Sequence, residues 1–148
     1  MDGALIARVV VDTSVYIAVL RDRVFAQAFR PRYERELART YMSSVVAAEL
    51  LAGAWTASER RHAVELYAPF ERVRRIVTPT HQTWKDVGDV AAGLARRRPD
   101  LRAKLRMGLQ NDILIALGAR AIGARVVTLN RADFEIIRAF RPFQLEIV

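Results

Sequence analysis

Three stretches of the chain each contain a single charged residue, and in each stretch that residue is acidic. They are residues 9–20 with Asp12, residues 40–58 with Glu49, and residues 107–119 with Asp112. Because 27% of the whole chain is charged, these stretches together would carry roughly twelve charges at average composition. The three acids therefore stand in segments that otherwise lack charge.

An ionised carboxylate in apolar surroundings is costly to bury unless it is paired or binds a metal ion. A fourth acid, Asp133, follows the apolar run VVTLN, although Arg131 and Glu135 flank it. The chain has no cysteine, and its two histidines are His62 and His81, so a metal site would use oxygen ligands. Such ligands favour Mg²⁺ or Mn²⁺ over zinc. If the four acids converge, they predict a metal-dependent hydrolase that acts on phosphodiesters.

Each acid also has an ordinary structural explanation when it is taken alone. Asp12 could form a turn, Glu49 could pair with an arginine, and Asp112 could lie favourably in the first turn of a helix. Asp133 could be the N-cap of a short helix, a position where aspartate is common. Because unrelated explanations would have to coincide on three charge-poor segments, we favour a shared metal site.

The composition predicts a basic, globular protein. The 148 residues include 24 lysines and arginines against 16 aspartates and glutamates, a net charge of +8, and 52% of the chain is apolar. This length suits one domain over residues 1–148, and the positive charge favours a polyanionic partner such as nucleic acid. We recognise no signal peptide or membrane-spanning run, so we expect a soluble, cytoplasmic protein with no membrane partner.

Short apolar runs alternate with helical patterns along the chain. The expected strands cover residues 8–12, 40–44, 74–79, 124–130 and 143–148. The expected helices cover residues 15–39 with a break near Pro31, 45–54 capped by Ser43 or Ser44, 58–71 capped by Ser58, 83–98, 111–122 ended by Gly123, and 131–137. This alternation predicts an α/β fold with a parallel sheet covered on both faces. Ligands of such sheets bind at the carboxyl ends of the strands, where Asp12 and the segment NRAD lie.

Four segments carry a family resemblance. VVVDTSVYIAVL, SSVVAAELLAG, NDILIALGAR and VVTLNRADF resemble, in order and spacing, the PIN-domain ribonucleases, specifically the VapC-type toxins of toxin–antitoxin pairs. The resemblance covers essentially the whole chain. It implies a three-layer α/β/α sandwich around a mainly parallel, four- to five-stranded sheet. It also implies a Mg²⁺- or Mn²⁺-dependent endoribonuclease that forms a homodimer, with a cognate antitoxin covering apolar surface on the N-terminal helices.

The resemblance also assigns roles to individual residues. It implies a catalytic, metal-binding site formed by Asp12, Glu49, Asp112 and Asp133. Thr13 and Ser14 match hydroxyl residues that would hydrogen-bond the ligands, and Asn130 matches a polar residue that would orient the last acid. In such families an antitoxin often inserts a basic side chain beside the carboxylates and keeps the enzyme inactive.

One segment departs from the family pattern. The stretch from Arg96 to Arg106 is longer and more basic than the resemblance leads us to expect, with six lysine or arginine residues. We interpret it as a phosphate-binding loop in which Arg97, Arg98 and Arg102 contact RNA. A solvated helix end explains the same charges equally well.

Other functions fit the sequence less well. A haloacid-dehalogenase-type phosphatase would place an aspartate where Ser14 stands, and no glycine-rich dinucleotide-binding turn follows the first strand. Two alternatives stay open beside the toxin. One is a PIN-fold nuclease that processes RNA, and the other is a non-catalytic RNA-binding or scaffold subunit.

Overall fold

The computed structural model describes residues 7–148 and contains a sheet of five parallel strands. The spatial order of the strands is β3-β2-β1-β4-β5. Their bounds are β1 (Arg8–Val11), β2 (Thr40–Ser43), β3 (Ile76–Val77), β4 (Ala124–Thr128) and β5 (Gln144–Ile147). The predicted parallel sheet of four to five strands is confirmed.

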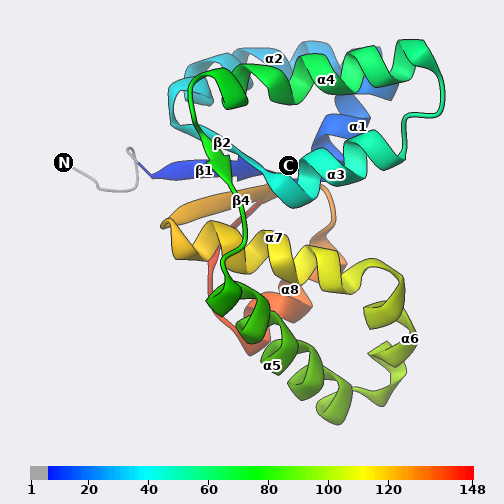
Figure 1. The fold of residues 1–148 in the computed structure, drawn as a ribbon, viewed down its shortest axis with the longest axis vertical. Helices are drawn as coiled ribbons and strands as arrows, with labels where there is room; N and C mark the ends of the chain where they lie inside the picture. Colours follow the sequence, from blue (N-terminus) through cyan, green and yellow to red (C-terminus); the bar gives the residue numbers. More distant parts are fainter. Residues whose placement is uncertain (1–6) are drawn as a thin grey trace.

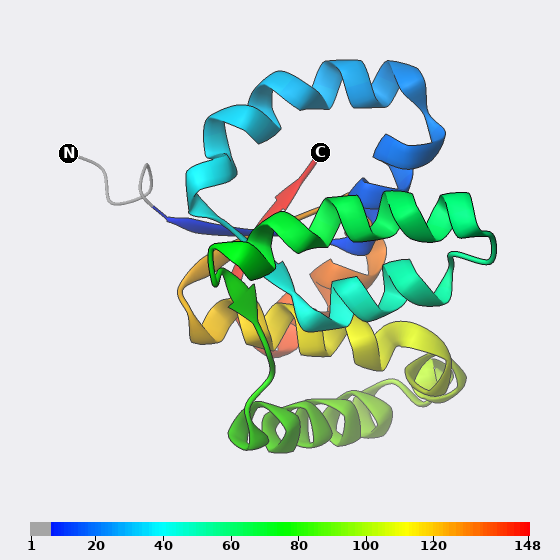
Figure 2. The same cartoon turned by 45° about the horizontal axis from the view of Figure 1, so that its top comes forward.

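Helices cover both faces of this sheet. The longer ones are α1 (Thr13–Arg21), α2 (Arg23–Glu36), α3 (Ser44–Ala52), α4 (Ala57–Arg72), α5 (His81–Arg97), α7 (Gln110–Ala121) and α8 (Arg131–Phe140). The short ones are η2 (Leu37–Arg39), η3 (Pro99–Leu101), α6 (Arg102–Lys104) and the π-helical turn η4 (Leu105–Leu109). In both views α2 and α4 lie on one side of the sheet, and α7 lies between the sheet and α5 on the other (Figures 1 and 2). The three-layer α/β/α sandwich is thereby confirmed.

The central strands are apolar on both faces because helices cover both. Val10 in β1 pairs with Val126 in β4, and both side chains are fully buried. Parallel strands buried in this way read as continuous β-branched runs, such as RVVV in β1. No helix within residues 7–148 combines the length and apolar character needed to cross a membrane.

The first helical region breaks at Asp22, so the predicted break near Pro31 is wrong. The Asp22 carboxylate accepts hydrogen bonds from the backbone N–H groups of Val24 and Phe25, which makes it the N-cap of α2. Pro31 lies inside α2. It removes one backbone donor from the helix without ending it.

Three other predicted helix boundaries lie at or near those observed. α4 is capped by Thr56, whose hydroxyl accepts from the backbone N–H of Glu59, so the predicted cap at Ser58 is wrong by two residues. Gly123 follows the last residues of α7 with φ of 68°, a left-handed conformation that glycine adopts without strain. Ser43 caps α3, as one of the two predicted alternatives.

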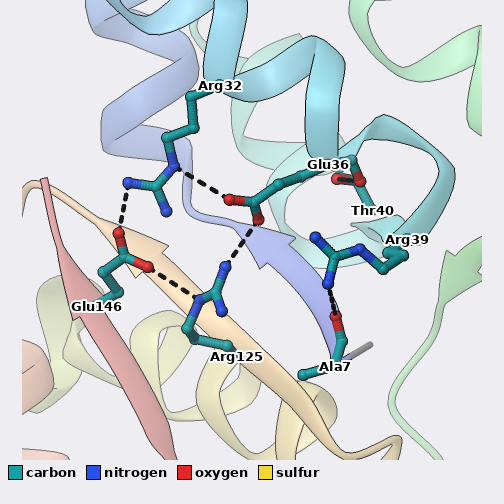
Figure 3. A network of polar contacts seen from close by, with 7 residues as sticks. All are labelled: Ala7, Arg32, Glu36, Arg39, Thr40, Arg125 and Glu146. Atoms are coloured by element: carbon teal, nitrogen blue, oxygen red, sulfur yellow. Dashed lines mark hydrogen bonds and ion pairs between the residues drawn. The ribbon is translucent and has the colours of Figure 1, made fainter. Parts of the chain in front are cut away.

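A closed ring of four charges joins α2 to the two strands at one edge of the sheet. Arg125 in β4 lies between Glu36 of α2, at 2.7 Å, and Glu146 of β5, at 3.0 Å (Figure 3). Arg32 completes the ring with ion pairs to the same two glutamates. The four side chains are 16–36% exposed, so solvent screens the ring only partly.

The contact between α5 and α8 depends on a glycine. A Cβ atom at Gly93 would stand 2.1 Å from Cζ of Phe140. Gly93→Ala is therefore expected to destabilise the protein by about 1–3 kcal/mol, because the phenyl ring must move out of a packed site. Urea unfolding would measure the change.

Gly88 in the same helix provides the matched control. A Cβ atom there would meet nothing within 4 Å, so Gly88→Ala is expected to stabilise the protein by up to about 1 kcal/mol through helix propensity. Equal effects from the two substitutions would contradict the packing of Phe140 against Gly93.

Candidate active site

Asp12 lies directly after β1 at the carboxyl end of the sheet. Its backbone N–H donates to the carbonyl of Val127 at 2.9 Å, which extends the pairing of β1 with β4. The side chain is 3% exposed, and its Oδ2 accepts hydrogen bonds from the hydroxyls of Ser14 and Thr128, each at 2.7 Å. Two hydroxyl donors from different elements therefore fix one buried carboxylate oxygen.

Glu49 reaches the same region from α3. Its Oε1 accepts a hydrogen bond from the Thr13 hydroxyl at 2.7 Å, so α1 holds the carboxylate in place. Burial raises the pKa of Glu49; the Thr13 hydrogen bond opposes this, and the charge of Asp12 adds to it. Glu49 therefore lies within the electrostatic reach of Asp12.

Asp112 stands in the first turn of α7 and shows the strongest perturbation of the four acids. Burial, followed by the charges of Asp12, Asp133 and Glu49, raises the pKa of Asp112 to about 8. A carboxyl with this pKa keeps its proton at neutral pH. Four acids from four different segments therefore lie close together at the carboxyl end of the sheet.

Asp133 lies in the first turn of α8, where Asn130 is the N-cap. The Asn130 side chain accepts from the backbone N–H of Asp133 at 3.3 Å and donates to Oδ2 of the same residue at 3.0 Å. The Lys104 ammonium forms an ion pair with Oδ1. Burial works to raise the pKa of Asp133, but hydrogen bonds from Lys104 and Asn130 outweigh it and lower the pKa. Asp112 and Asp133 also share a side-chain hydrogen bond, which raises the pKa of Asp112 and lowers that of Asp133, so Asp133 is the ionised member of this pair.

The donor set fits a hard divalent cation. All four groups are carboxylates, and their mutual repulsion is what a bound cation would relieve. In the conformation seen, no three acidic or histidine side chains within residues 7–148 are arranged to hold an ion. The oxygens of Asp12, Glu49 and Asp133 instead contact the hydroxyl, amide and ammonium groups described above.

The family of the chain follows from a comparison with known domain families. The PIN-domain family matches residues 9–139, which includes all four acids and the strands that position them. The chain belongs to the PIN-domain family. The family predicted from the sequence is thus confirmed.

Several solved structures that share this fold are named VapBC. The PIN domain aligns with a chain of DNA-bound VapBC from Salmonella typhimurium at 22% identity, a TM-score of 0.66, and 95% and 98% coverage of the two chains. It aligns with VapBC2 of Rickettsia felis, bound to a promoter fragment, at 20% identity, a TM-score of 0.65, and 94% and 97% coverage. It aligns with VapBC-1 of nontypeable Haemophilus influenzae at 21% identity, a TM-score of 0.62, and 94% and 96% coverage of the two chains. No curated protein sequence matches the chain significantly.

The hydroxyl and amide residues predicted to support the acids do contact them in this PIN domain. Thr13 binds Glu49, Ser14 binds Asp12, and Asn130 binds Asp133. Thr128 and Lys104 were not singled out from the sequence. Thr128 carried a usable signal, because it is a polar residue at the end of a buried strand; Lys104 carried none beyond the general basicity of its segment.

The three arginines predicted to bind RNA lie on the outer side of the PIN domain, around α5. Arg97 stacks over the Phe140 ring at 4.7 Å, Arg98 pairs with Asp100, and Arg102 donates to the carbonyl of Ala95. Within residues 7–148 none of the three forms an ion pair with a site acid. From their basic segment it is Lys104 that reaches the carboxylates.

A pocket of about 250 Å³ opens beside Glu49, between α1, α3 and α4. Its charged and polar lining comprises Arg21, Glu49, Glu59 and His62. His62 is exposed on α4, as predicted from the sequence. Of the four acids of the cluster, Glu49 contributes to the lining of this pocket.

Proposed function

We propose that this PIN domain is a divalent-metal-dependent endoribonuclease and the toxin of a toxin–antitoxin pair. One observation carries the proposal: the carboxylates of Asp12, Glu49, Asp112 and Asp133 lie close together at the carboxyl end of the sheet. Burial and the charges of the other three acids raise the pKa of Asp112 to about 8. A PIN-domain match over residues 9–139 and the likeness to VapBC chains support it.

Mg²⁺ or Mn²⁺ would be held by the four acids, and when bound it supplies Lewis acidity to the phosphodiester and to an attacking water. The residues of the chain keep the carboxylates ready for this role. Thr13, Ser14 and Thr128 fix oxygens of Glu49 and Asp12 through short hydrogen bonds. The raised pKa of Asp112 keeps a proton on this carboxyl at neutral pH, and a bound cation would favour its loss, so metal binding should be accompanied by proton release.

RNA fits the charge of the molecule as substrate. The net charge of +8 favours a polyanion, and its phosphates would bring further negative charge to a site that then holds a cation. We infer that Arg97, Arg98 and Arg102 bind phosphates outside the catalytic cluster, since they lie around α5. We also infer a single domain over residues 1–148, in which the sheet runs from Arg8 to Ile147.

An apolar surface on the N-terminal helices supports the antitoxin as partner. A cavity of about 170 Å³ there is lined by Tyr16, Val19, Ala26, Phe29, Arg30, Tyr33 and Leu66. Nearby on the same helices, Val24 is 76% exposed and Leu20 is 45% exposed. A partner segment with apolar side chains would cover this surface. The homodimer and the cytoplasmic location stay parts of the same proposal.

RNA cleavage tests the function directly. Purified protein is incubated with total cellular RNA in Mg²⁺, in Mn²⁺ and in EDTA, and the new RNA ends are mapped. We expect discrete cuts that need a divalent ion, that vanish in Glu49→Gln, and that persist in Glu65→Gln, an exposed site on α4. Uncut RNA in every condition, together with retained RNA binding, would favour the non-catalytic module. Cuts in RNA precursors alone would favour RNA processing.

A further inference from the structure

Lys104 connects the basic segment to the acidic cluster. It ends α6, and its ammonium forms an ion pair with Oδ1 of Asp133. The lysine side chain is 49% exposed, whereas the aspartate side chain is 12% exposed. The half-exposed Lys104 side chain therefore places its positive charge beside the nearly buried carboxylate of Asp133.

The backbone around Lys104 is shaped for this contact. The turn η4 follows directly, and Gly108 within it has φ of 152°, where side-chain-bearing residues are rare. This break lets the α6 segment fold back beside the start of α7, which carries Asp112. Lys104 thus reaches the cluster from α6, whereas Thr13 and Ser14 belong to α1.

The ammonium takes the position at Asp133 that a metal ion would need. Asn130 already binds Oδ2, and Lys104 neutralises Oδ1. Two cations on one carboxylate oxygen repel each other strongly where solvent is largely excluded. A lysine ammonium is a compact charge on a flexible stem of four carbons, so it can leave the carboxylate for water without moving the backbone.

We propose that Lys104 is a residue of the metal site that sets its affinity, because the lysine ammonium and the divalent cation alternate at Asp133. In the metal-free protein Lys104 balances the carboxylate charge, and metal entry displaces it. The inference rests on the proposed function, since it requires that the four acids bind a divalent ion.

Calorimetric titration of the metal-free protein with Mn²⁺ tests the competition. Lys104→Met keeps the stem and removes the charge, and we expect it to bind Mn²⁺ at least about tenfold more tightly than the wild type. Lys85→Met is the control, because Lys85 is the other lysine of the chain and lies exposed on α5. It should bind as the wild type does, and Lys104→Arg should restore the competition.

Unchanged or weaker Mn²⁺ binding by Lys104→Met, beside measurable binding by the wild type, would overturn the inference and leave the proposed function standing. Absence of Mn²⁺ binding in both proteins would overturn the metal site and the inference together. Binding by Lys104→Met alone would support the competition in its strongest form.

The wild-type protein offers a second measurement that needs no active-site substitution. With two lysines in the chain, ¹³C-lysine labelling gives two side-chain signals, and Lys85→Met assigns them. Saturation with Mg²⁺ should shift the Lys104 signal towards that of a solvent-exposed lysine and leave Lys85 unchanged. An unmoved Lys104 signal at saturation would show that lysine and metal do not exclude each other.

Discussion

Asp112→Asn is expected to stabilise the metal-free protein at alkaline pH and to abolish RNA cleavage. The carboxyl of Asp112 is buried among three other acids, which raises its pKa to about 8. Asparagine has nearly the same shape and cannot ionise, so it removes the repulsion that the folded protein otherwise tolerates. A group that costs stability but is needed for metal binding is typical of a functional site.

The pH dependence has a definite sign. The folded pKa of Asp112, about 8, lies above its ordinary value of 3.8, so its contribution to stability is complete below about pH 4. That contribution is lost as the pH rises towards 8, because the Asp112 carboxyl ionises at its ordinary pKa in the unfolded chain but keeps its proton in the folded protein. At pH 9 we expect Asp112→Asn to be more stable than the wild type by about 2–4 kcal/mol, after allowing for partial solvent screening.

Urea unfolding at pH 5 and pH 9 measures this difference. Asp89→Asn, on the exposed face of α5, removes the same charge and should leave the pH dependence as it is. An identical loss of stability between the two pH values in wild type and Asp112→Asn would show that the carboxyl ionises normally.

The activity of the same variant should fall by at least about a thousandfold, because a neutral amide is a poor ligand for a hard cation. The RNA-cleavage assay described above measures it, with Asp89→Asn as the active control. Substantial cleavage by a folded Asp112→Asn would remove Asp112 from the catalytic set.

Arg125→Met is expected to destabilise the protein although Arg125 lies outside the acidic site. Arg125 pairs with both Glu36 and Glu146 in the charge ring, and its loss leaves Arg32 to balance two carboxylates (Figure 3). Removing one partner from a partly buried ion pair leaves an uncompensated charge in a poorly solvated place. We expect a destabilisation of about 2–3 kcal/mol, since the ring is neither fully buried nor freely exposed.

Arg30→Met gives the comparison for this substitution in urea unfolding. Arg30 pairs with Glu34 on the same helix, but the two side chains are 78% and 58% exposed. Its loss should change stability by no more than about 0.5 kcal/mol. A similar small change for Arg125→Met would mean that solvent screens the ring as effectively as it screens a surface pair.

The sequence alone determined the order of the elements and the identity of the acidic residues. Buried parallel strands need β-branched runs, and charge is excluded from the segments that pack on them. Asp12, Glu49 and Asp112 were therefore visible as isolated charges before any fold was known. Thr13, Ser14 and Asn130 came from the family resemblance. The contacts of Ser14 with Asp12 and of Asn130 with Asp133 are local to their turns, whereas Thr13 contacts Glu49 across 36 residues of sequence.

Helix boundaries were harder to predict from the sequence, because they depend on which polar side chain accepts hydrogen bonds from the free backbone N–H groups of the first turn. Asp22 is the N-cap of α2, so the break between helices lies there. The sequence suggested a break near Pro31, but α2 continues through this residue. Thr56 likewise takes the start of α4 in place of Ser58. Competition between neighbouring caps is decided by small free-energy differences that the residue types do not reveal.

Only the tertiary structure decided which distant groups meet. Thr128 binds Asp12 across 116 residues of sequence, and Arg125 binds Glu36 across 89. Lys104 reaches Asp133 because the backbone turns back at Gly108. The physical reason is that the apolar residues around a carboxylate, which make its burial costly, are neighbours in sequence. The group that pairs with the carboxylate is set by the packing of distant segments. The sequence therefore determined where the charges stand, and the fold decided what neutralises them.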